Sequence, residues 1–138
     1  MKDCVFCKII NNEIPSIKIY EDKDVLAMLD IRPAIKQGGH VLIMPKKHFE
    51  LITDLPDDLL SKLSLVIKKI SKALLKFGEG LNVLQNNKRI AGQAIPHVHF
   101  HLIPRFPNDG VMVERWVSVE YKNGEAKKVA AKIKSLLK

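Results

Sequence analysis

The segment from His97 to Ile103 alternates polar and apolar side chains, with histidines at 97, 99 and 101 and hydrophobic residues between and after them. Successive side chains of a β-strand point to opposite faces, so the alternation predicts a strand over Val98–Ile103. The three imidazoles would share one face, about 6.5–7 Å apart along the chain, above a floor of hydrophobes. Pro96 lacks a backbone N–H, which places the start of this strand there or puts it at a sheet edge.

A long amphipathic helix is expected between Pro56 and Gly78. Proline suits the first helical position, Asp57 and Asp58 suit the first turn, and glycine suits the position after the last turn. Apolar residues recur every three or four positions, which predicts one buried face. That face consists of Leu59, Leu63, Val66, Ile70, Leu74 and Phe77.

The remaining elements are short. A helix is expected over Phe6–Asn11 and a further one after Gly124-Glu125, with Val129, Ile133 and Leu136 facing inward. The other expected strands are Ile17–Tyr20, Val25–Leu29, His40–Met44 and Leu81–Leu84. Because the strands cluster as hairpins and do not alternate with helices, the predicted class is α+β with an antiparallel sheet of five strands.

Length and composition favour one domain over residues 1–138. A chain of 138 residues can bury one core and is too short for two. Its apolar runs are far shorter than the ~20 residues that cross a bilayer, and its start lacks the apolar stretch of a secretory signal. A cytoplasmic protein without a membrane-spanning helix is therefore expected.

The net charge of +8 could indicate a nucleic-acid or phosphate-bearing partner. Ten of the lysines, however, lie in two segments at helical spacing between apolar residues, over residues 62–76 and 127–138. Solvated helix faces explain them, so nucleic acid is not expected as a partner.

Three histidines on one face suit phosphoryl or nucleotidyl transfer. Imidazole, with an unperturbed pKa of ~6.5, is mostly neutral and nucleophilic at neutral pH. One ring can attack phosphorus while a neighbouring protonated ring hydrogen-bonds the leaving group. The alternatives are an ordinary half-exposed strand and a three-histidine metal site, for which the row is too straight.

Cys4 and Cys7 form the sequence's one C-x-x-C. A disulfide between them would close almost no loop, which leaves metal binding, redox chemistry or free thiols. A redox dithiol usually opens a helix after a strand, and no strand is expected before Cys4.

His97-Val98-His99-Phe100-His101-Leu102-Ile103 resembles the signature of the histidine triad (HIT) family of nucleotide hydrolases and transferases. Further motifs are similar to its prokaryotic HINT-like branch, namely Cys4–Ile10, Glu13-Ile14-Pro15, Tyr20-Glu21-Asp22, Leu29-Asp30-Ile31, Gly39-His40, Pro45–His48 and Gly92-Gln93. The likeness covers residues 4–105, and the tail 106–138 is not diagnostic. It implies the HIT fold, with the sheet continued across a homodimer.

The resemblance assigns roles to four histidines. His99 would attack the α-phosphorus and form a nucleotidyl-histidine, which water then cleaves. His101 would contact the leaving atom; glutamine stands there in the transferase branch, so histidine favours hydrolysis. His97 completes the triad, and His40 resembles a fourth active-site histidine, although a hydrogen-bonded core histidine is an alternative.

The same resemblance implies a nucleotide site. Asp30 would accept the ribose hydroxyls, and the apolar set would line the base pocket or, alternatively, belong to the core. That set is Phe6, Ile9, Met28, Leu29, Ile31 and Leu42. Asn86 and Gln93 would bind the phosphate and its surroundings. The remaining positions assigned to nucleotide binding are Gly92, Ala94, Ile95, His99 and His101. Many relatives carry Ser or Thr where this chain has Ala94, so one hydroxyl donor is missing.

Zinc-containing HIT relatives carry a Cys₂His₂ set that corresponds to Cys4, Cys7, His48 and His97. Four such ligands with no open position are typical of structural Zn²⁺.

The expected function is hydrolysis of purine nucleoside phosphoramidates or related nucleotidyl conjugates to the nucleoside monophosphate. The alternatives are a dinucleoside polyphosphate hydrolase and a non-catalytic nucleotide-binding or scaffold protein.

Overall fold

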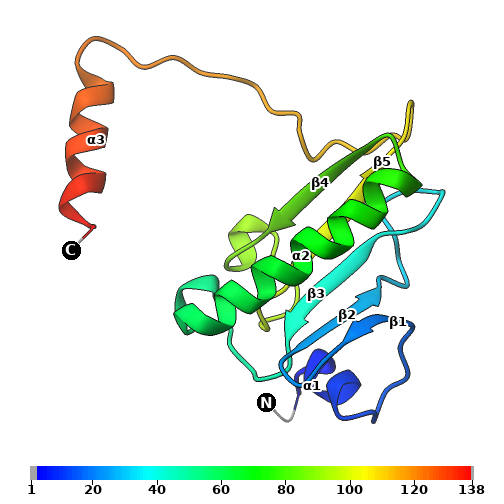
Figure 1. Ribbon diagram of the computed structural model, residues 1–138. Helices are drawn as coiled ribbons and strands as arrows, with labels where there is room; N and C mark the ends of the chain where they lie inside the picture. Colours follow the sequence, from blue (N-terminus) through cyan, green and yellow to red (C-terminus); the bar gives the residue numbers. More distant parts are fainter. Residues whose placement is uncertain (1–2, 138) are drawn as a thin grey trace.

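The computed structural model describes residues 3–137, and within them one antiparallel sheet has five strands in the order β1-β2-β3-β5-β4 (Figure 1). The predicted five-stranded α+β fold is confirmed. The strands are β1 (Lys18–Glu21), β2 (Val25–Leu29), β3 (Val41–Pro45), β4 (Gly80–Gln85) and β5 (Phe100–Arg105).

Helix α2 (Asp57–Phe77) crosses one face of the sheet (Figure 1). It begins after Pro56 and ends before Gly78, as predicted, and it buries Leu63, Val66, Ile70 and Leu74. A single turn of 3-10 helix, η1 (Ile52–Asp54), precedes it, and a second, η2 (Arg89–Ala91), lies between β4 and β5. The core beneath α2 includes Val25 and Ala27 of β2 and Phe100 and Leu102 of β5.

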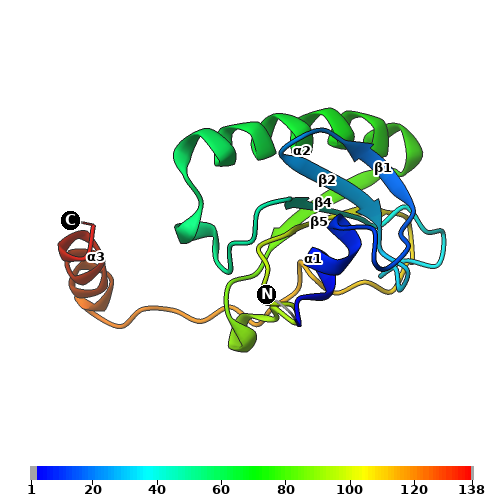
Figure 2. The ribbon, with the colours of Figure 1, turned by 90° about the horizontal axis from the view of Figure 1, so that it is seen from below.

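Helix α1 (Val5–Ile10) lies on the opposite face of the sheet from α2 (Figure 2). Its buried residues Phe6 and Ile9 pack against Leu26 and Met28, the alternate residues of β2. The strand is therefore buried on both faces, which explains why it reads as a continuous apolar run. The sheet face under α1 is the one that carries the histidines.

Strand β5 begins at Phe100 and not at Val98, which corrects the predicted strand. The N–H of Val98 donates to the carbonyl of Phe49 in the loop after β3, 2.7 Å away, and the N–H of His97 turns back to Ile95. The side chains still alternate, with Val98 in the core beneath α2. From Phe100 on, β5 pairs with β3 in a register that sets Leu42 opposite His101.

A tight turn before β3 brings the backbone against the end of α2. Gly38 and Gly39 have φ of +78° and +83°, a region that side chains with a Cβ rarely adopt. A Cβ at Gly39 would also stand 2.6 Å from Cε1 of Phe77. The positive φ favours glycine at both positions, and at Gly39 the ring of Phe77 would also have to move. The turn delivers His40 to the sheet.

The C-terminal segment leaves the sheet and ends in helix α3 (Glu125–Ser135), which stands apart from the sheet in both views (Figures 1 and 2). The helix begins where predicted, but Val129, Ile133 and Leu136 do not face inward, since they are 40%, 54% and 73% exposed. The pattern correctly identified an apolar side, but residues 112–124 carry the helix away from the core. The homodimer expected from the resemblance stays a prediction.

Among residues 3–137, no helix is long and apolar enough to cross a membrane.

Arg105, the last residue of β5, fixes the chain that follows it. Its guanidinium donates to both carboxylate oxygens of Asp109, at 2.7 and 3.0 Å, and to Glu114 at 2.7 Å. Asp109 also accepts the backbone N–H groups of Phe106 and Val111. These bonds, led by the one from Arg105, hold the pKa of Asp109 well below its ordinary value of 3.8.

We expect Asp109→Asn to lower the melting temperature by several degrees near neutral pH. A carboxylate with a lowered folded-state pKa stabilises the fold above its unfolded pKa, and that stabilisation is lost as the pH falls below 3.8 toward the folded value. The difference in melting temperature between wild type and variant should therefore become smaller in acid. Melting curves followed by circular dichroism over this range measure it, with Glu120→Gln on the exposed C-terminal segment as control. A gap that is constant with pH would contradict this role of the charge.

Candidate functional site

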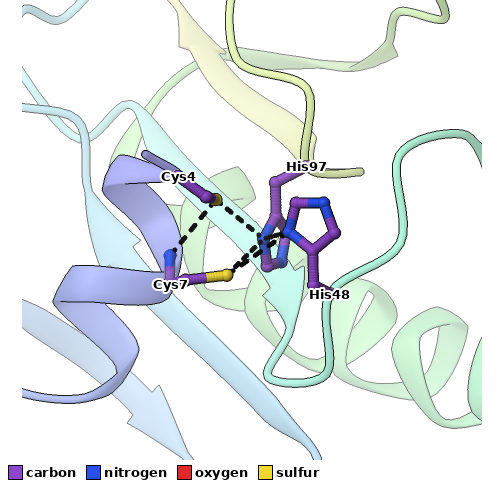
Figure 3. Close-up of side chains that lie close together, drawn as sticks. All are labelled: Cys4, Cys7, His48 and His97. Atoms are coloured by element: carbon purple, nitrogen blue, oxygen red, sulfur yellow. Dashed lines mark hydrogen bonds between the residues drawn. The ribbon is translucent and has the colours of Figure 1, made fainter. Parts of the chain in front are cut away.

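Four potential metal ligands meet at one end of the sheet (Figure 3). Cys4 caps the N-terminus of α1, where its Sγ accepts the N–H of Cys7 at 3.3 Å. Cys7 lies in the first turn of α1, His48 follows β3, and His97 precedes β5. The Cys₂His₂ set proposed from the sequence is thus brought together from segments up to 93 residues apart.

The distances within this cluster suit a tetrahedral ion. Nδ1 of His97 lies 3.4 Å from Sγ of Cys4 and 3.6 Å from Sγ of Cys7. The two Nδ1 atoms of His48 and His97 are 3.2 Å apart, and Cys7 Sγ is 3.3 Å from His48 Nδ1. A zinc ion with ordinary bond lengths holds its sulfur and nitrogen ligands roughly 3.6 Å apart and two nitrogens roughly 3.3 Å apart. The donor atoms fit the metal that the sequence predicts.

The ring of His97 is fixed in the orientation that such a site needs. Its Nε2 donates to the carbonyl of Pro45, 2.8 Å away, which leaves Nδ1 without a proton and directed into the cluster. Burial lowers the pKa of His97 to about 4, so the ring is neutral at neutral pH. Burial also raises the pKa of the Cys7 thiol to about 11, the opposite of the shift in redox-active dithiols.

The backbone carbonyl of His97 holds the ring of His99. Its Nδ1 donates to the carbonyl of His97 at 2.7 Å, so Nε2 keeps a free lone pair. The ring packs edge-on against Phe6 of α1, with 4.9 Å between centroids, and lies 5.0 Å from the ring of His101. Burial lowers the pKa of His99 as well.

His101 is oriented by His40, which stands just before β3. The N–H of Ala34 donates to Nδ1 of His40 at 3.0 Å, so the proton of neutral His40 is on Nε2. That Nε2 donates to Nδ1 of His101, 2.9 Å away, and the proton of neutral His101 is therefore on its own Nε2. Burial lowers the pKa of His101 to about 4 and lowers that of His40, with the Asp30 carboxylate partly opposing both shifts.

A cavity of about 200 Å³ opens beside these histidines. It adjoins them through Phe6, which contacts His99, and through Asp30, whose Oδ2 lies 3.8 Å from Nε2 of His40. All seven residues assigned to the ribose and base line it, namely Phe6, Ile9, Met28, Leu29, Asp30, Ile31 and Leu42. The sequence reasoning missed Val5, Ile14, Pro15 and Ser16, although the last three lie in or beside the Glu13-Ile14-Pro15 motif.

Five further residues assigned to nucleotide binding lie outside the lining of this cavity, between the end of β4 and His97, namely Asn86, Gly92, Gln93, Ala94 and Ile95. Asn86 sits against Gly92, whose φ of +97° makes the turn. The buried amide of Gln93 is engaged by the backbone, accepting from Lys88 and donating to Glu50. Ala94 is exposed and Ile95 packs at the edge of the core around α1.

Comparison with known proteins identifies the relatives of this chain. The HIT domain family matches residues 11–108. An uncharacterized HIT-like protein of Methanocaldococcus jannaschii is 48% identical over 95% of this chain and 98% of its own length. An adenosine 5'-monophosphoramidase of Candida albicans is 50% identical over 74% of this chain and 70% of its own.

The solved structures agree. The crystal structure of a HIT family member from Bacillus subtilis superposes with a TM-score of 0.89, at 38% identity, over 99% of this chain and 98% of that one. The family match, the relatives and the shared fold agree with the histidine motif. This chain belongs to the histidine triad family.

Proposed function

We propose that the protein hydrolyses nucleoside phosphoramidates and related nucleotidyl conjugates at the α-phosphorus, releasing a nucleoside monophosphate. The orientation of His99 carries the proposal. A ring whose Nδ1 is bound to a carbonyl presents the lone pair of Nε2, the atom that must attack phosphorus. The Candida albicans relative, an adenosine 5'-monophosphoramidase, supports the substrate class.

In the first step, Nε2 of His99 forms a bond to phosphorus as the bond to the leaving nitrogen breaks. The electron pair of that bond departs with the nitrogen, which needs a proton. The anionic phosphate of a bound substrate favours protonation of His101, because a nearby negative charge raises the pKa of histidine. His101 then delivers the proton from Nε2 to the leaving nitrogen.

In the second step, water attacks the phosphorus of the nucleotidyl-histidine. His101, now neutral, accepts a proton from that water through Nε2, and His99 leaves as the neutral ring. In the ligand-free protein the N–H of His40 occupies Nδ1 of His101, which leaves Nε2 of His101 facing the reaction. When His101 takes its second proton on Nδ1, that bond breaks and the N–H of His40 turns to Oδ2 of Asp30, 3.8 Å away. One residue therefore serves as acid and then as base, as the two-step chemistry requires.

The cavity supports a ribonucleoside as the bound group. Oδ1 of Asp30 accepts the N–H of Arg32 at 2.9 Å, which orients the carboxylate at the cavity rim. A carboxylate can accept hydrogen bonds from two vicinal hydroxyls, so we assign Asp30 to the ribose. The apolar lining around Phe6 and Ile9 suits the faces of a purine.

We assign the Cys₂His₂ cluster to structural Zn²⁺, with Cys4, Cys7, His48 and His97 as its ligands. A closed set of four protein ligands leaves no position for substrate or water, so the metal would act on stability and position. The carbonyl of Pro45 supports this assignment by holding His97 in the ligating orientation.

His99→Ala should abolish turnover and the covalent intermediate, with a loss on the order of 10⁴-fold or more, about 5 kcal/mol in the barrier. Rapid-quench mass spectrometry with adenosine phosphoramidate maps any AMP adduct to a peptide. His101→Ala is the matched control, since it should still form the adduct, at a reduced rate. An adduct on His97 or His101, or normal turnover by His99→Ala, would refute the assignment.

The hydrogen bond from His40 predicts the protonation of His101 in the ligand-free protein. Its ring should carry the proton on Nε2 and should not become charged until the pH is well below 6.5. Saturation with AMP should raise this pKa, because the phosphate is negatively charged. Two-dimensional ¹⁵N NMR of the histidine rings reads both properties. A proton on Nδ1, or a titration that AMP leaves unchanged, would contradict the proposed role.

Protein purified without chelators should contain about one zinc per chain. Removing the metal should lower the melting temperature, since the folded cluster binds zinc more tightly than the unfolded chain does. Mass spectrometry for metals and thermal melts test this, with His101→Ala as a control that keeps all four ligands. Freely titrating thiols and a metal content far below one equivalent would exclude the assignment.

A further inference from the structure

Helix α1 belongs to the metal cluster and to the nucleotide cavity at the same time. Cys4 and Cys7, at its N-cap and in its first turn, supply two of the four donor atoms. Val5, Phe6 and Ile9 of the same helix line the cavity. The sulfur ligands and one wall of the cavity are therefore a single short segment of chain.

This helix has little stability of its own. It is six residues long, below the length at which isolated helices form in water. Cys4 provides its N-cap through sulfur, a weak acceptor, in place of the oxygen that caps usually supply. Its position must come from packing of Phe6 and Ile9 and from the attachment of its cysteines to His48 and His97, which belong to the sheet side.

The wall that α1 provides also touches the proposed nucleophile. The ring of Phe6 meets the ring of His99 edge-on at an interplanar angle of 85°, and it contacts His97 at a centroid distance of 5.9 Å. His97 in turn offers the carbonyl that holds Nδ1 of His99. A displacement of α1 would widen the cavity and remove the contact of Phe6 with the His99 ring.

We propose that Cys4 and Cys7 are positioning residues for nucleotide binding. By joining α1 to His48 and His97 through the metal, they hold Val5, Phe6 and Ile9 at the spacing of a bound nucleoside. Occupancy of the cluster then sets the affinity for nucleotide as well as the stability of the fold. This inference rests on the proposed function only in taking a nucleotide as the ligand of the cavity.

The test compares Cys7→Ser with wild type by isothermal titration calorimetry, using AMP as the probe. The variant should lose its zinc, and the Kd for AMP should rise about tenfold or more, because a wall that is no longer preorganised must be ordered on binding. Hydrogen exchange at the amides of residues 5–10 should become faster. Removal of zinc from wild type by a chelator should reproduce both changes, and returning zinc should reverse them. This experiment tests the proposal even if Cys7→Ser does not fold.

Leu63→Ala is the matched control. Leu63 is fully buried in the core beneath α2, away from α1, so its truncation lowers stability without touching the tether. At a temperature where both variants are folded by circular dichroism, Leu63→Ala should bind AMP with the wild-type Kd. This control separates positioning of α1 from a general loss of stability.

Zinc-free protein that binds AMP with the wild-type Kd would overturn the inference, as would a Leu63→Ala variant weakened to the same degree. Wild type that does not bind AMP at all would instead count against the proposed function. In that case the exchange rates of residues 5–10, with and without zinc, still decide whether the metal holds α1.

Discussion

The antiparallel pairing of β3 with β5 brings four of the five histidines together in two pairs. His40 precedes β3 and His48 follows it, while His97 precedes β5 and His101 lies within it. Because the strands run in opposite directions, His40 meets His101 near one end of the pair and His48 meets His97 at the other. A shift of one residue in this register would turn His101 to the α2 face, where the core excludes an unpartnered imidazole.

The same pairing separates two kinds of histidine chemistry that the sequence motif presents as one row. The hydrogen bond to the carbonyl of Pro45 directs Nδ1 of His97 toward the cysteines, and His101 is hydrogen-bonded to His40. His99, between them, is bound through Nδ1 by the backbone alone. The three rings therefore present different groups: His97 an unprotonated Nδ1, His99 an unprotonated Nε2 and His101 a protonated Nε2, and this difference comes from their partners.

Sequence reasoning predicted best where local chemistry decides the structure. The bounds of α2 follow from Pro56, the aspartates after it and Gly78, and the strands follow from apolar runs ended by turns. It was wrong where a distant partner decides. The carbonyl of Phe49 takes the N–H of Val98 and delays β5, and the apolar side of α3 gives no information on what, if anything, lies beneath it. The residues of the site were anticipated largely through the family resemblance. Val5 and Ser16 were missed because their positions at the cavity depend on how the chain before β1 folds back over the sheet.

The close approach of Gly39 to Phe77 gives the protein an uneven tolerance to substitution. A smaller residue at position 77 would relieve the 2.6 Å contact that alanine at position 39 would make, but it could not relieve the strain of a φ of +83°. Compensation between the two positions is therefore incomplete, and the order in which they change matters. Phe77 can therefore change while Gly39 stays, whereas a side chain introduced first at position 39 meets both the strained φ and the ring of Phe77.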